Sequence, residues 1–216
     1  MRNKYYVNVA IVVICLVISG WALAKSVVLG VLQNPDKVII HKVPHIHGLG
    51  PDPLEITEIK VKGSERQAGK GFVEDGEWLN DTTFKLTNTY SKPITYLQLN
   101  VNFPEVTLKV HPEATFQYQI FLGRHPRYKS ERPELLIMPG DTIEVSLASY
   151  YEEMKRMIEP NKEQLNYPVN SLNRVNRIEF YLSEAAFSDG TLYSGGRMHE
   201  RNPDPNGRQK WIQIKQ

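Results

Sequence analysis

The chain has 216 residues, of which 41% are hydrophobic, 23% are charged and 10% are aromatic. The formal net charge is only +2 at pH 7, which argues against a nucleic-acid partner and against an acidic tail. The composition is typical of a folded globular protein, and the residues beyond the N-terminal segment are enough for one domain with a sizeable core.

Residues 1–24 have the pattern of a signal peptide or of a membrane anchor. Two basic residues come early, an apolar run follows at Val7–Ile18, and the segment closes on Ala-Leu-Ala at Ala24. Cleavage after Ala24 would start the mature protein at Lys25, whereas an uncleaved segment, at the low end of membrane-spanning length, would anchor the protein. A buried core helix of a soluble domain fits the basic start poorly. Both main alternatives place residues 25–216 outside the cytoplasm, in a periplasmic, secreted or membrane-anchored protein.

Cys15 is the only cysteine of the chain, and it lies within this N-terminal segment. It does not fit a lipoprotein site, because Ile14 precedes it where that chemistry requires a small residue at the end of the apolar run. The exported part therefore has no disulfide, no cysteine nucleophile and no cysteine metal ligand. We expect no cofactor.

Residues 25–53 are predicted to form a linker that precedes a single domain at residues 54–216. The stretch at 33–53 contains four prolines and two glycines, which interrupt regular structure. Within it, the apolar residues Val38–Ile40 could add one short strand.

From Leu54 onwards, apolar residues alternate with polar ones, which is the pattern of half-buried β-strands. The first such segment, Leu54–Lys62, contains one phase slip, which indicates a β-bulge. The polar stretch at 63–76 is predicted to be a loop. Seven or eight short strands separated by turns predict a two-sheet antiparallel β-sandwich. The alternating segments lie at 54–62, 82–88, 94–103, 107–110, 115–122, 142–147, 174–183 and 210–215.

One short helix is expected to interrupt the strands, beginning near Ser149 and ending before Pro160. Ser149 is a suitable N-cap, and Glu152 three residues later would complete a capping box. We expect the apolar face of this helix to close one end of the sandwich, and the alternative is a surface for a membrane or a partner. The residues on that face are Tyr150, Met154, Met157 and Ile158.

Several short motifs resemble those of exported β-sandwich proteins. Leu86–Thr89 with Lys92–Ile94 resembles the paired strands of immunoglobulin-like and fibronectin-like domains. Leu136–Thr142 is similar to the turn that opens a later strand in many such modules. The resemblance implies an extracytoplasmic fold and no activity. The expected fold class is therefore mainly β, an immunoglobulin-like sandwich with one inserted helix, preceded by an N-terminal hydrophobic helix. The segments that resemble the C-terminal region of uncharacterised bacterial extracytoplasmic proteins are Phe187–Thr191, Tyr193, Gly196 and Arg201–Pro203.

A cluster of histidines in the linker is a candidate metal site. His45 and His47 would share a face of an extended chain, and His41 could fold back beside them near Asp52. Imidazole ligands in this number suit zinc or copper. The alternative is a solvated or interface-packing linker. The remaining histidines, among them His125, are isolated in the sequence.

The loops at 188–197 and 198–207 are the preferred candidate for binding a partner, because loops above a rigid sandwich commonly carry function. Their oxygen-rich side chains, which include Glu200 and Asn206, could in principle hold calcium, but they lack the alternation of acidic residues typical of a calcium loop, and a series of turns explains them better. The candidate binding residues are Asp189, Tyr193, Arg197, Glu200, Arg201 and Asp204.

Two further features have both a functional and an ordinary interpretation. The basic loop at 123–132 could attract anionic glycans, phosphate head groups or an acidic partner, or it could simply be solvated. Trp78, at the entry to a strand, is expected in the core, and a carbohydrate-stacking role would require its exposure.

The sequence contains neither a Gly-x-Ser-x-Gly elbow nor a His-Glu-x-x-His helix, and it has no glycine-rich phosphate loop. We therefore expect a non-catalytic interaction or structural module of the cell envelope, which binds protein or polysaccharide. If the N-terminal segment is uncleaved, the membrane is a second partner. The alternatives are a hydrolase that acts on an envelope polymer and a metal-binding protein that uses the linker histidines.

Overall fold

The computed structural model describes residues 37–42, 52–74, 77–127, 131–166, 172, 175–204, 206 and 209–214, and for 37–42 it describes the backbone alone. The chain divides into two compact units, residues 1–36 and 37–216. The predicted signal peptide or anchor therefore lies outside the described residues. Within the described ranges, no helix is both long enough and apolar enough to cross a membrane.

The described residues form two β-sheets, and the larger is organised around β10 (Arg177–Phe187). Its neighbours are antiparallel to β10, apart from β1 (Lys37–Lys42), which is parallel. The sequence analysis allowed a short strand at Val38–Ile40, and β1 is that strand. The remaining strands of this sheet are β4 (Phe72–Val73), β6 (Ile94–Leu108), β7 (Thr115–Gly123), β9 (Leu165–Asn166), β11 (Leu192–Ser194), β12 (Arg197–Arg201) and β13 (Trp211–Gln213).

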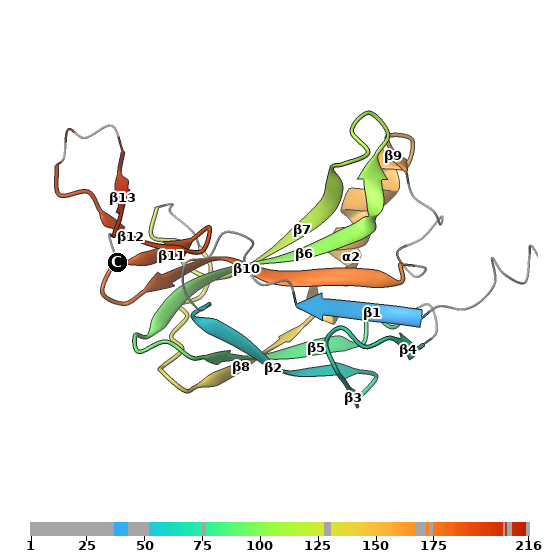
Figure 1. Cartoon of the computed structure of the whole chain (residues 1–216), viewed down its shortest axis with the longest axis horizontal. Helices are drawn as coiled ribbons and strands as arrows, with labels where there is room; N and C mark the ends of the chain where they lie inside the picture. The colour runs from blue at the N-terminus through green and yellow to red at the C-terminus, as the bar shows by residue number, and fades with distance from the viewer. Residues whose placement is uncertain are drawn as a thin grey trace, which may run out of the picture. The chain divides into compact units, whose positions relative to one another are not determined.

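The two edges of β10 are used differently. Along one edge, β6 pairs with residues 179–187. Because a strand has only two edges, the other partners must share the opposite edge, where β1 pairs with residues 177–180 and β11 with residues 184–186. The N-terminal strand and the C-terminal hairpin therefore lie one after the other along the same side of β10 (Figure 1).

The smaller sheet has the order β3-β2-β5-β8. Its pairing is antiparallel throughout, and the register between β2 and β5 shifts between Ile56 and Glu58. This shift confirms the bulge that the phase slip at 54–62 predicted. The strands of this sheet are β2 (Leu54–Val61), β3 (Ser64–Arg66), β5 (Thr82–Asn88) and β8 (Thr142–Ser146).

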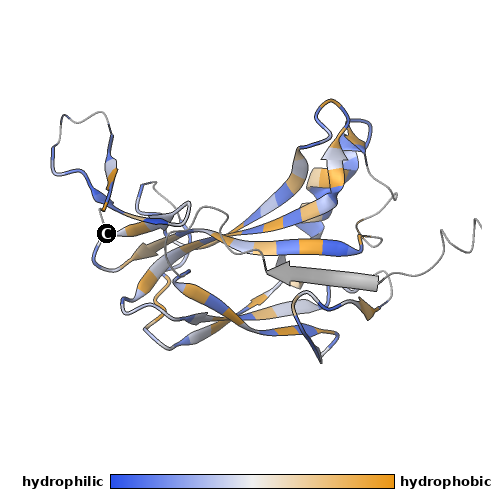
Figure 2. Cartoon of the chain, in the orientation of Figure 1, coloured by the Kyte–Doolittle hydropathy of each residue, from blue (hydrophilic) through white to orange (hydrophobic). Residues whose placement is uncertain are grey.

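One hydrophobic core lies between the two sheets. In Figure 2, apolar residues alternate with polar ones along the strands. The core-facing residues of β6 are fully buried, and the ring of Phe84 in the smaller sheet stacks on Phe180 in β10 with 4.4 Å between centroids. The fully buried residues of β6 are Ile94, Leu97, Leu99, Val101, Phe103 and Val106.

The predicted helix exists as α2 (Ala148–Ile158), but its predicted cap is wrong. The N-cap is Leu147, without a side-chain cap bond, so Ser149 lies inside the helix and forms no capping box with Glu152. Met154 and Ile158 are buried against the core, as expected. Met157, predicted on the same face, is instead 44% exposed.

The chain leaves the helix through the 3₁₀ turn η1 (Glu159–Asn161), which carries Pro160. Pro160 lies two residues after Ile158, the last residue of α2, so the helix ends before the proline as the sequence predicted. Tyr118 in β7 ties the helix to the larger sheet, because its hydroxyl donates to Glu153 at 2.7 Å.

The stretch at 63–76 is not only a loop, because it contributes the short strands β3 and β4. Trp78 follows this stretch and is 1% exposed. Its indole N–H donates to the carbonyl of Val175 at 2.8 Å, so Trp78 is a core residue as expected and does not offer a surface for stacking sugars.

Candidate functional site

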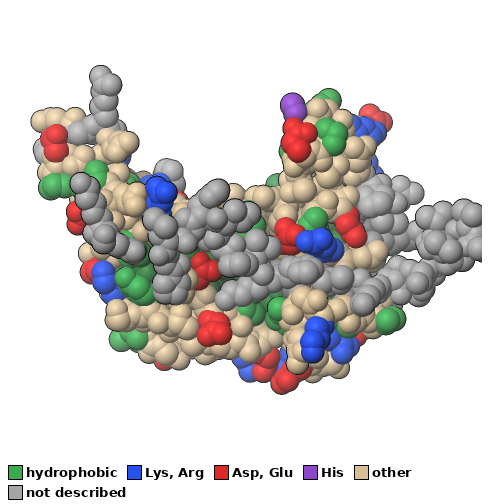
Figure 3. Space-filling model, in the orientation of Figure 1, with side chains coloured by type: hydrophobic (Ala, Val, Ile, Leu, Met, Phe, Trp, Pro, Cys, Tyr) green, Lys and Arg blue, Asp and Glu red, His purple; other side chains and the backbone are tan. Residues whose placement is uncertain are grey.

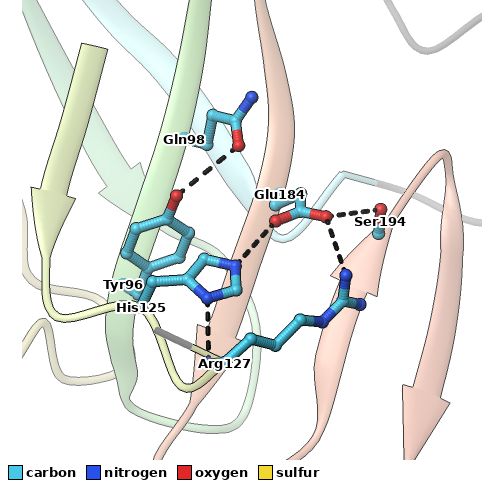
Figure 4. A network of polar contacts seen from close by, with 6 residues as sticks. All are labelled: Tyr96, Gln98, His125, Arg127, Glu184 and Ser194. Carbon is cyan, nitrogen blue, oxygen red and sulfur yellow. Dashed lines mark hydrogen bonds and ion pairs between the residues drawn. The ribbon is translucent and has the colours of Figure 1, made fainter. Parts of the chain in front are cut away.

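The outer face of the larger sheet, away from the core, carries a network of polar contacts (Figure 4). In β6 the odd-numbered residues from Leu97 to Phe103 face the core, so the even-numbered ones face outward. In β10, alternation alone would turn Glu184 inward, like Leu182. A register shift between these two residues reverses the phase and pairs Glu184 with outward-facing Gln98. The bulge therefore places a carboxylate on the outer face.

Glu184 is the centre of this network, which we call the Glu184 cluster: Tyr96, Gln98, His125, Arg127, Glu184 and Ser194 (Figure 4). One carboxylate oxygen lies 3.1 Å from Nε2 of His125. The other accepts the hydroxyl proton of Ser194 at 3.0 Å and lies 3.9 Å from the guanidinium of Arg127. The side chains of His125 and Glu184 are only 9% and 16% exposed, so these interactions are largely shielded from water.

The contacts of His125 define its tautomer. The backbone N–H of Arg127 donates to Nδ1 at 2.9 Å, so Nδ1 carries no proton. Nε2 must then carry it and donate to Glu184. The edge of the imidazole also meets the ring of Tyr96, with 4.5 Å between centroids and an angle of 81°. Both nitrogens of His125 are thus engaged, and the ring is held on three sides.

Two arginines of the basic loop lie over aromatic rings beside the cluster. The guanidinium of Arg127 is 5.1 Å from the ring centroid of Trp211 in β13, and that of Arg132 is 4.5 Å from Phe121 in β7. The basic loop at 123–132 and the loop at 188–197, which contains Ser194, were separate candidates in the sequence. The structure brings them together on the outer face of one sheet.

A row of amide side chains continues the polar face along β6. Asn100 donates to the hydroxyl of Tyr181 at 3.0 Å, and Asn102 donates to Glu179 at 2.8 Å. Asn100 is 5% exposed, and its carbonyl oxygen has no hydrogen-bond partner among the described residues. This row adds ordered donors and acceptors next to the Glu184 cluster.

The connectivity of the cluster does not fit a catalytic triad. In a triad the histidine lies between the nucleophile and the acid. Here the carboxylate of Glu184 lies between Ser194 and His125, and the Ser194 hydroxyl directs its proton at that carboxylate. Because Nδ1 of His125 is occupied by a backbone N–H, the ring is not placed to take a proton from the serine.

Asp189 forms a turn between β10 and β11. Its carboxylate accepts the backbone N–H of Thr191 at 3.0 Å and the hydroxyl at 2.6 Å, and it lies 2.5 Å from the ammonium of Lys92. Burial alone would raise the pKa of Asp189, but the hydrogen bonds from Lys92 and Thr191 outweigh it and lower the pKa from 3.8 to about 2. The charged side chain of Asp189 therefore stabilises the turn.

Tyr193 lies in the core and not on a binding loop. It is the central residue of β11 and is 3% exposed, whereas Ser194 beside it faces the Glu184 cluster. Its hydroxyl donates to the carboxylate of Asp52, just before β2. Burial, and after it the hydrogen bond to the charged Asp52, raise the pKa of the phenol above its usual value.

Three of the other predicted binding residues lie in a strand. Arg197, Glu200 and Arg201 belong to β12 and are exposed, so the region predicted as loop is in part a β11–β12 hairpin. Arg197 donates to the side chain of Gln213 at 3.2 Å. Asp204 is exposed in the loop that follows.

The side chains of that last loop serve its own turns. The backbone N–H of Asp204 donates to the side chain of Asn202 at 3.0 Å, and that of Asn206 donates to the carboxylate of Asp204 at 2.9 Å. These oxygens therefore cap the loop, as the turn interpretation predicted.

The candidate metal ligands cannot be placed together. His41 is described through its backbone in β1, and His45 and His47 lie outside the described residues. Within the part of the chain that is described, no three side chains of His, Cys, Asp or Glu come together in a way that could hold a metal ion.

Charged side chains of both signs lie on the face shown in Figure 3. In the view of Figure 3, acidic and basic side chains are interspersed over the visible face, in keeping with the small net charge. The chain matches no protein-family model, no curated protein and no solved structure. The site must therefore be judged from its own geometry.

Most members of this surface escaped the sequence analysis. His125 was considered isolated, and neither Glu184 nor Trp211 was a candidate. His125 and Glu184 are 59 residues apart, and no local pattern joins them. The signal that the sequence did offer is the arginine content of the basic loop, because arginine is enriched among the residues that contribute most to binding.

Proposed function

We propose that the chain is an exported, non-catalytic interaction module of the cell envelope, built on an immunoglobulin-like sandwich. The strand order supports this fold. In an immunoglobulin domain, strands A, B and E share one sheet, and strands C′, C, F and G share the other. The neighbours β2-β5-β8 and β7-β6-β10-β11 have the same order, the same chain sequence and antiparallel pairing throughout. The N-terminal pattern of residues 1–24 supports export.

The proposed binding surface is the Glu184 cluster together with Trp211 and Phe121. The observation that carries this proposal is the position of Arg127. Its guanidinium lies 3.9 Å from the Glu184 carboxylate and 5.1 Å from the centroid of the Trp211 ring, so it joins the Glu184 cluster to β13. Arginine and tryptophan are the residues that contribute most often to binding energy in interfaces. The surroundings are ordered in advance, which lowers the entropic cost of binding.

A binding role fits this geometry better than hydrolysis does. The histidine, the serine and the carboxylate satisfy one another, so none of them is left poised to attack a substrate. Beside the cluster, the buried amides of Asn100 and Asn102 are bonded to Tyr181 and Glu179, which orders this part of the sheet. The partner class is therefore a protein or polysaccharide of the envelope.

The binding surface can be tested by in-cell crosslinking of a tagged full-length chain, followed by mass spectrometry of the co-purified material. We expect Arg127→Ala and Trp211→Ala each to reduce the recovered partner by about tenfold or more. The matched control is Arg156→Ala, an exposed arginine on α2 whose replacement keeps the helix propensity. Urea denaturation shows whether each variant is as stable as the wild type. If the variants are equally stable and all three recover the partner equally well, the proposed surface is wrong.

Export has a test of its own. A C-terminal tag should be cleaved by protease added to cells whose cytoplasm is sealed, after removal of any outer barrier. The mature N-terminus then separates the two forms: a chain that starts at Lys25 was cleaved after Ala24, and a chain that retains residues 1–24 is anchored. A tag protected by the sealed membrane would refute export.

A further inference from the structure

The C-terminal strands carry arginine side chains on the outer face of the larger sheet. Ser194 in β11 donates to Glu184 on that face, and it pairs with Arg197 in β12. Paired residues of adjacent strands lie on the same side of a sheet, and so do alternate residues of one strand. Arg197 and Arg201 therefore lie on the face of the Glu184 cluster, where both are exposed.

The position of Trp211 supports this placement by a second route. Arg201 is its register partner between β12 and β13, so the two side chains are neighbours on one face. The guanidinium of Arg127 lies 5.1 Å from the centroid of the same indole ring and 3.9 Å from the carboxylate of Glu184. Strand pairing and side-chain contacts thus bring the same residues together. We call this surface the arginine face: Arg127, Arg197, Arg201, Trp211 and Gln213.

The backbone under the arginine face is held in a fixed geometry. Gly195 and Gly196 join β11 to β12, and both have positive φ, +58° and +76°, as a two-residue hairpin turn requires. Trp211 packs against the buried residues Tyr96 and Leu192. The arginines are therefore presented from an ordered surface, which lowers the entropic cost of binding.

Positive charge exceeds negative charge on the arginine face. Among the described residues, its three arginines lie with one carboxylate, that of Glu184, which the rest of the cluster already satisfies. By alternation, Glu200 projects to the opposite side of β12, and Asp204 in the next loop accepts the backbone N–H of Asn206. The side chain of Arg201 forms no hydrogen bond or ion pair with another described residue. The face therefore has a positive local potential, although the chain as a whole is nearly neutral.

The composition of the arginine face fits an acidic polysaccharide better than a protein. The core of a protein interface is apolar, whereas Trp211 is only partly exposed and lies under Arg127. The exposed amide of Gln213 is a donor and acceptor for sugar hydroxyls, and arginine binds carboxylates and phosphates through paired hydrogen bonds. The strongly exposed large hydrophobic residues that the structure describes lie elsewhere: Val73, Val110, Leu136, Met138 and Met157.

We propose that the arginine face binds an acidic polysaccharide of the envelope through the carboxylate or phosphate groups of the polymer. This inference rests on the proposed function and specifies the chemistry of its partner. Arg197 and Arg201 are four residues apart in one strand, so about 13 Å separates their Cα atoms. A polymer with repeated charges contacts both of them, whereas a single small anion contacts only one.

The test measures binding of the purified full-length protein to three polymers with the same backbone. Carboxymethyl dextran supplies carboxylates, phosphorylated dextran supplies phosphates, and unmodified dextran is neutral. We expect binding to at least one charged polymer, several times weaker at about 200 mM salt than at about 50 mM, and no binding to dextran. Equal binding to charged and neutral dextran, or to none of the three, overturns the proposal. Tighter binding to polyglutamate, an acidic polypeptide, also overturns it.

Substitutions then show whether the arginine face is the site. Arg197→Gln and Arg201→Gln should each weaken binding by about fivefold or more, because each removes a charge from the face. Arg201→Lys keeps the charge and should bind more tightly than Arg201→Gln. The control is Arg156→Gln, at an exposed arginine of α2, which should bind like the wild type. An Arg201→Gln variant that binds as well as this control overturns the proposal.

The two sets of experiments separate this inference from the proposed function. If recovery of the cellular partner depends on Arg127 and Trp211 but no charged dextran binds, the binding surface is correct and its partner is not an acidic polysaccharide. If recovery depends on neither residue and no charged dextran binds, both proposals are wrong.

Discussion

The phenyl rings of Phe84 and Phe180 stack across the two sheets, with centroids 4.4 Å apart and planes inclined by 18°. Phe84 lies in β5, an interior strand of the smaller sheet, and Phe180 lies where β10 is paired on both edges, with β6 and with β1. Both side chains are fully buried or nearly so. The stack therefore links the centre of one sheet to the most heavily paired strand of the other.

Replacing Phe84 by alanine should be among the most destabilising single changes. The loss of a buried phenyl ring and the cavity it leaves cost about 3–5 kcal/mol of the free energy of unfolding. Urea denaturation followed by circular dichroism measures this change. The control is Val110→Ala, at a side chain 78% exposed, for which we expect a change within about 0.5 kcal/mol. Similar losses for the two variants would mean that the stack is not central to the core.

Alanine substitutions at two glycines distinguish the cost of backbone strain from the cost of a steric clash. Gly123 has φ +76° and Gly190 has φ +84°, so alanine is strained at both. A Cβ at Gly190 would meet nothing within 4 Å, whereas one at Gly123 would lie 2.3 Å from the carbonyl oxygen of Thr95 and 2.7 Å from Cβ of Leu135. We expect a loss of about 1 kcal/mol for Gly190→Ala and of more than about 2 kcal/mol for Gly123→Ala in urea denaturation. Equal losses would show that β7 can move away from β6 at this point.

The bond between Tyr193 and Asp52 predicts a loss of stability in alkali. Burial and the Asp52 carboxylate raise the pKa of Tyr193 in the folded protein, which favours the neutral phenol. Its contribution is complete below the unfolded pKa of about 10 and declines as the pH rises above that value. Tyr193→Phe removes the ionisable group, so the variant should lose less stability than the wild type between about pH 8 and pH 11.

At neutral pH the same variant should be less stable by about 1 kcal/mol, because the hydroxyl no longer bonds to Asp52. Tyr118, whose pKa is also raised by burial and by Glu153, remains in both proteins and provides the common background. Urea denaturation at the two pH values measures both effects. Parallel losses in the two proteins would exclude Tyr193 as a source of the alkaline sensitivity.

Asp189 predicts that the stability of the fold also falls in acid. Its pKa is lowered to about 2 in the fold, so its contribution is present above the unfolded pKa of 3.8 and is lost as the pH falls towards 2. Asp189→Asn retains a side-chain oxygen that can accept the hydrogen bonds of the turn, and it removes the charge. Because the side chain is 43% exposed, we expect a difference of less than about 1 kcal/mol. Thermal unfolding at about pH 5 and about pH 2.5 measures it, and a wild type that loses no more than the variant would refute the assignment.

The elements that the sequence predicted well are those whose signal is local. β5 spans Thr82–Asn88, as the alternation indicated, and the phase slip in 54–62 corresponds to an observed bulge. The end of the helix was predicted well, since α2 ends at Ile158 shortly before Pro160, but its N-cap is Leu147, two residues before the predicted Ser149. Alternation and helical spacing are properties of the chain itself, whereas a cap depends on how the preceding strand, β8, leads into the helix.

The candidate site depended on information that is not local. The orientation of Glu184 follows from a bulge in its pairing with β6, and His125 reaches it from 59 residues away. The β11–β12 hairpin was read as loop, because its three-residue strand at Leu192–Ser194 lies among glycine and Asp-Gly turn signals. Tertiary pairing decided both outcomes, and a single sequence carries no direct record of it.

The parallel pairing of β1 with β10 also constrains the order in which the domain assembles. Ile39 and Arg177 are partners that most of the length of the chain separates, so β1 emerges first and acquires its partner almost last. Contacts between such distant segments slow folding, and an early strand with an unpaired edge is exposed to other molecules in the meantime. The time between the synthesis of β1 and that of β10 is therefore the period in which neighbouring chains compete for this strand.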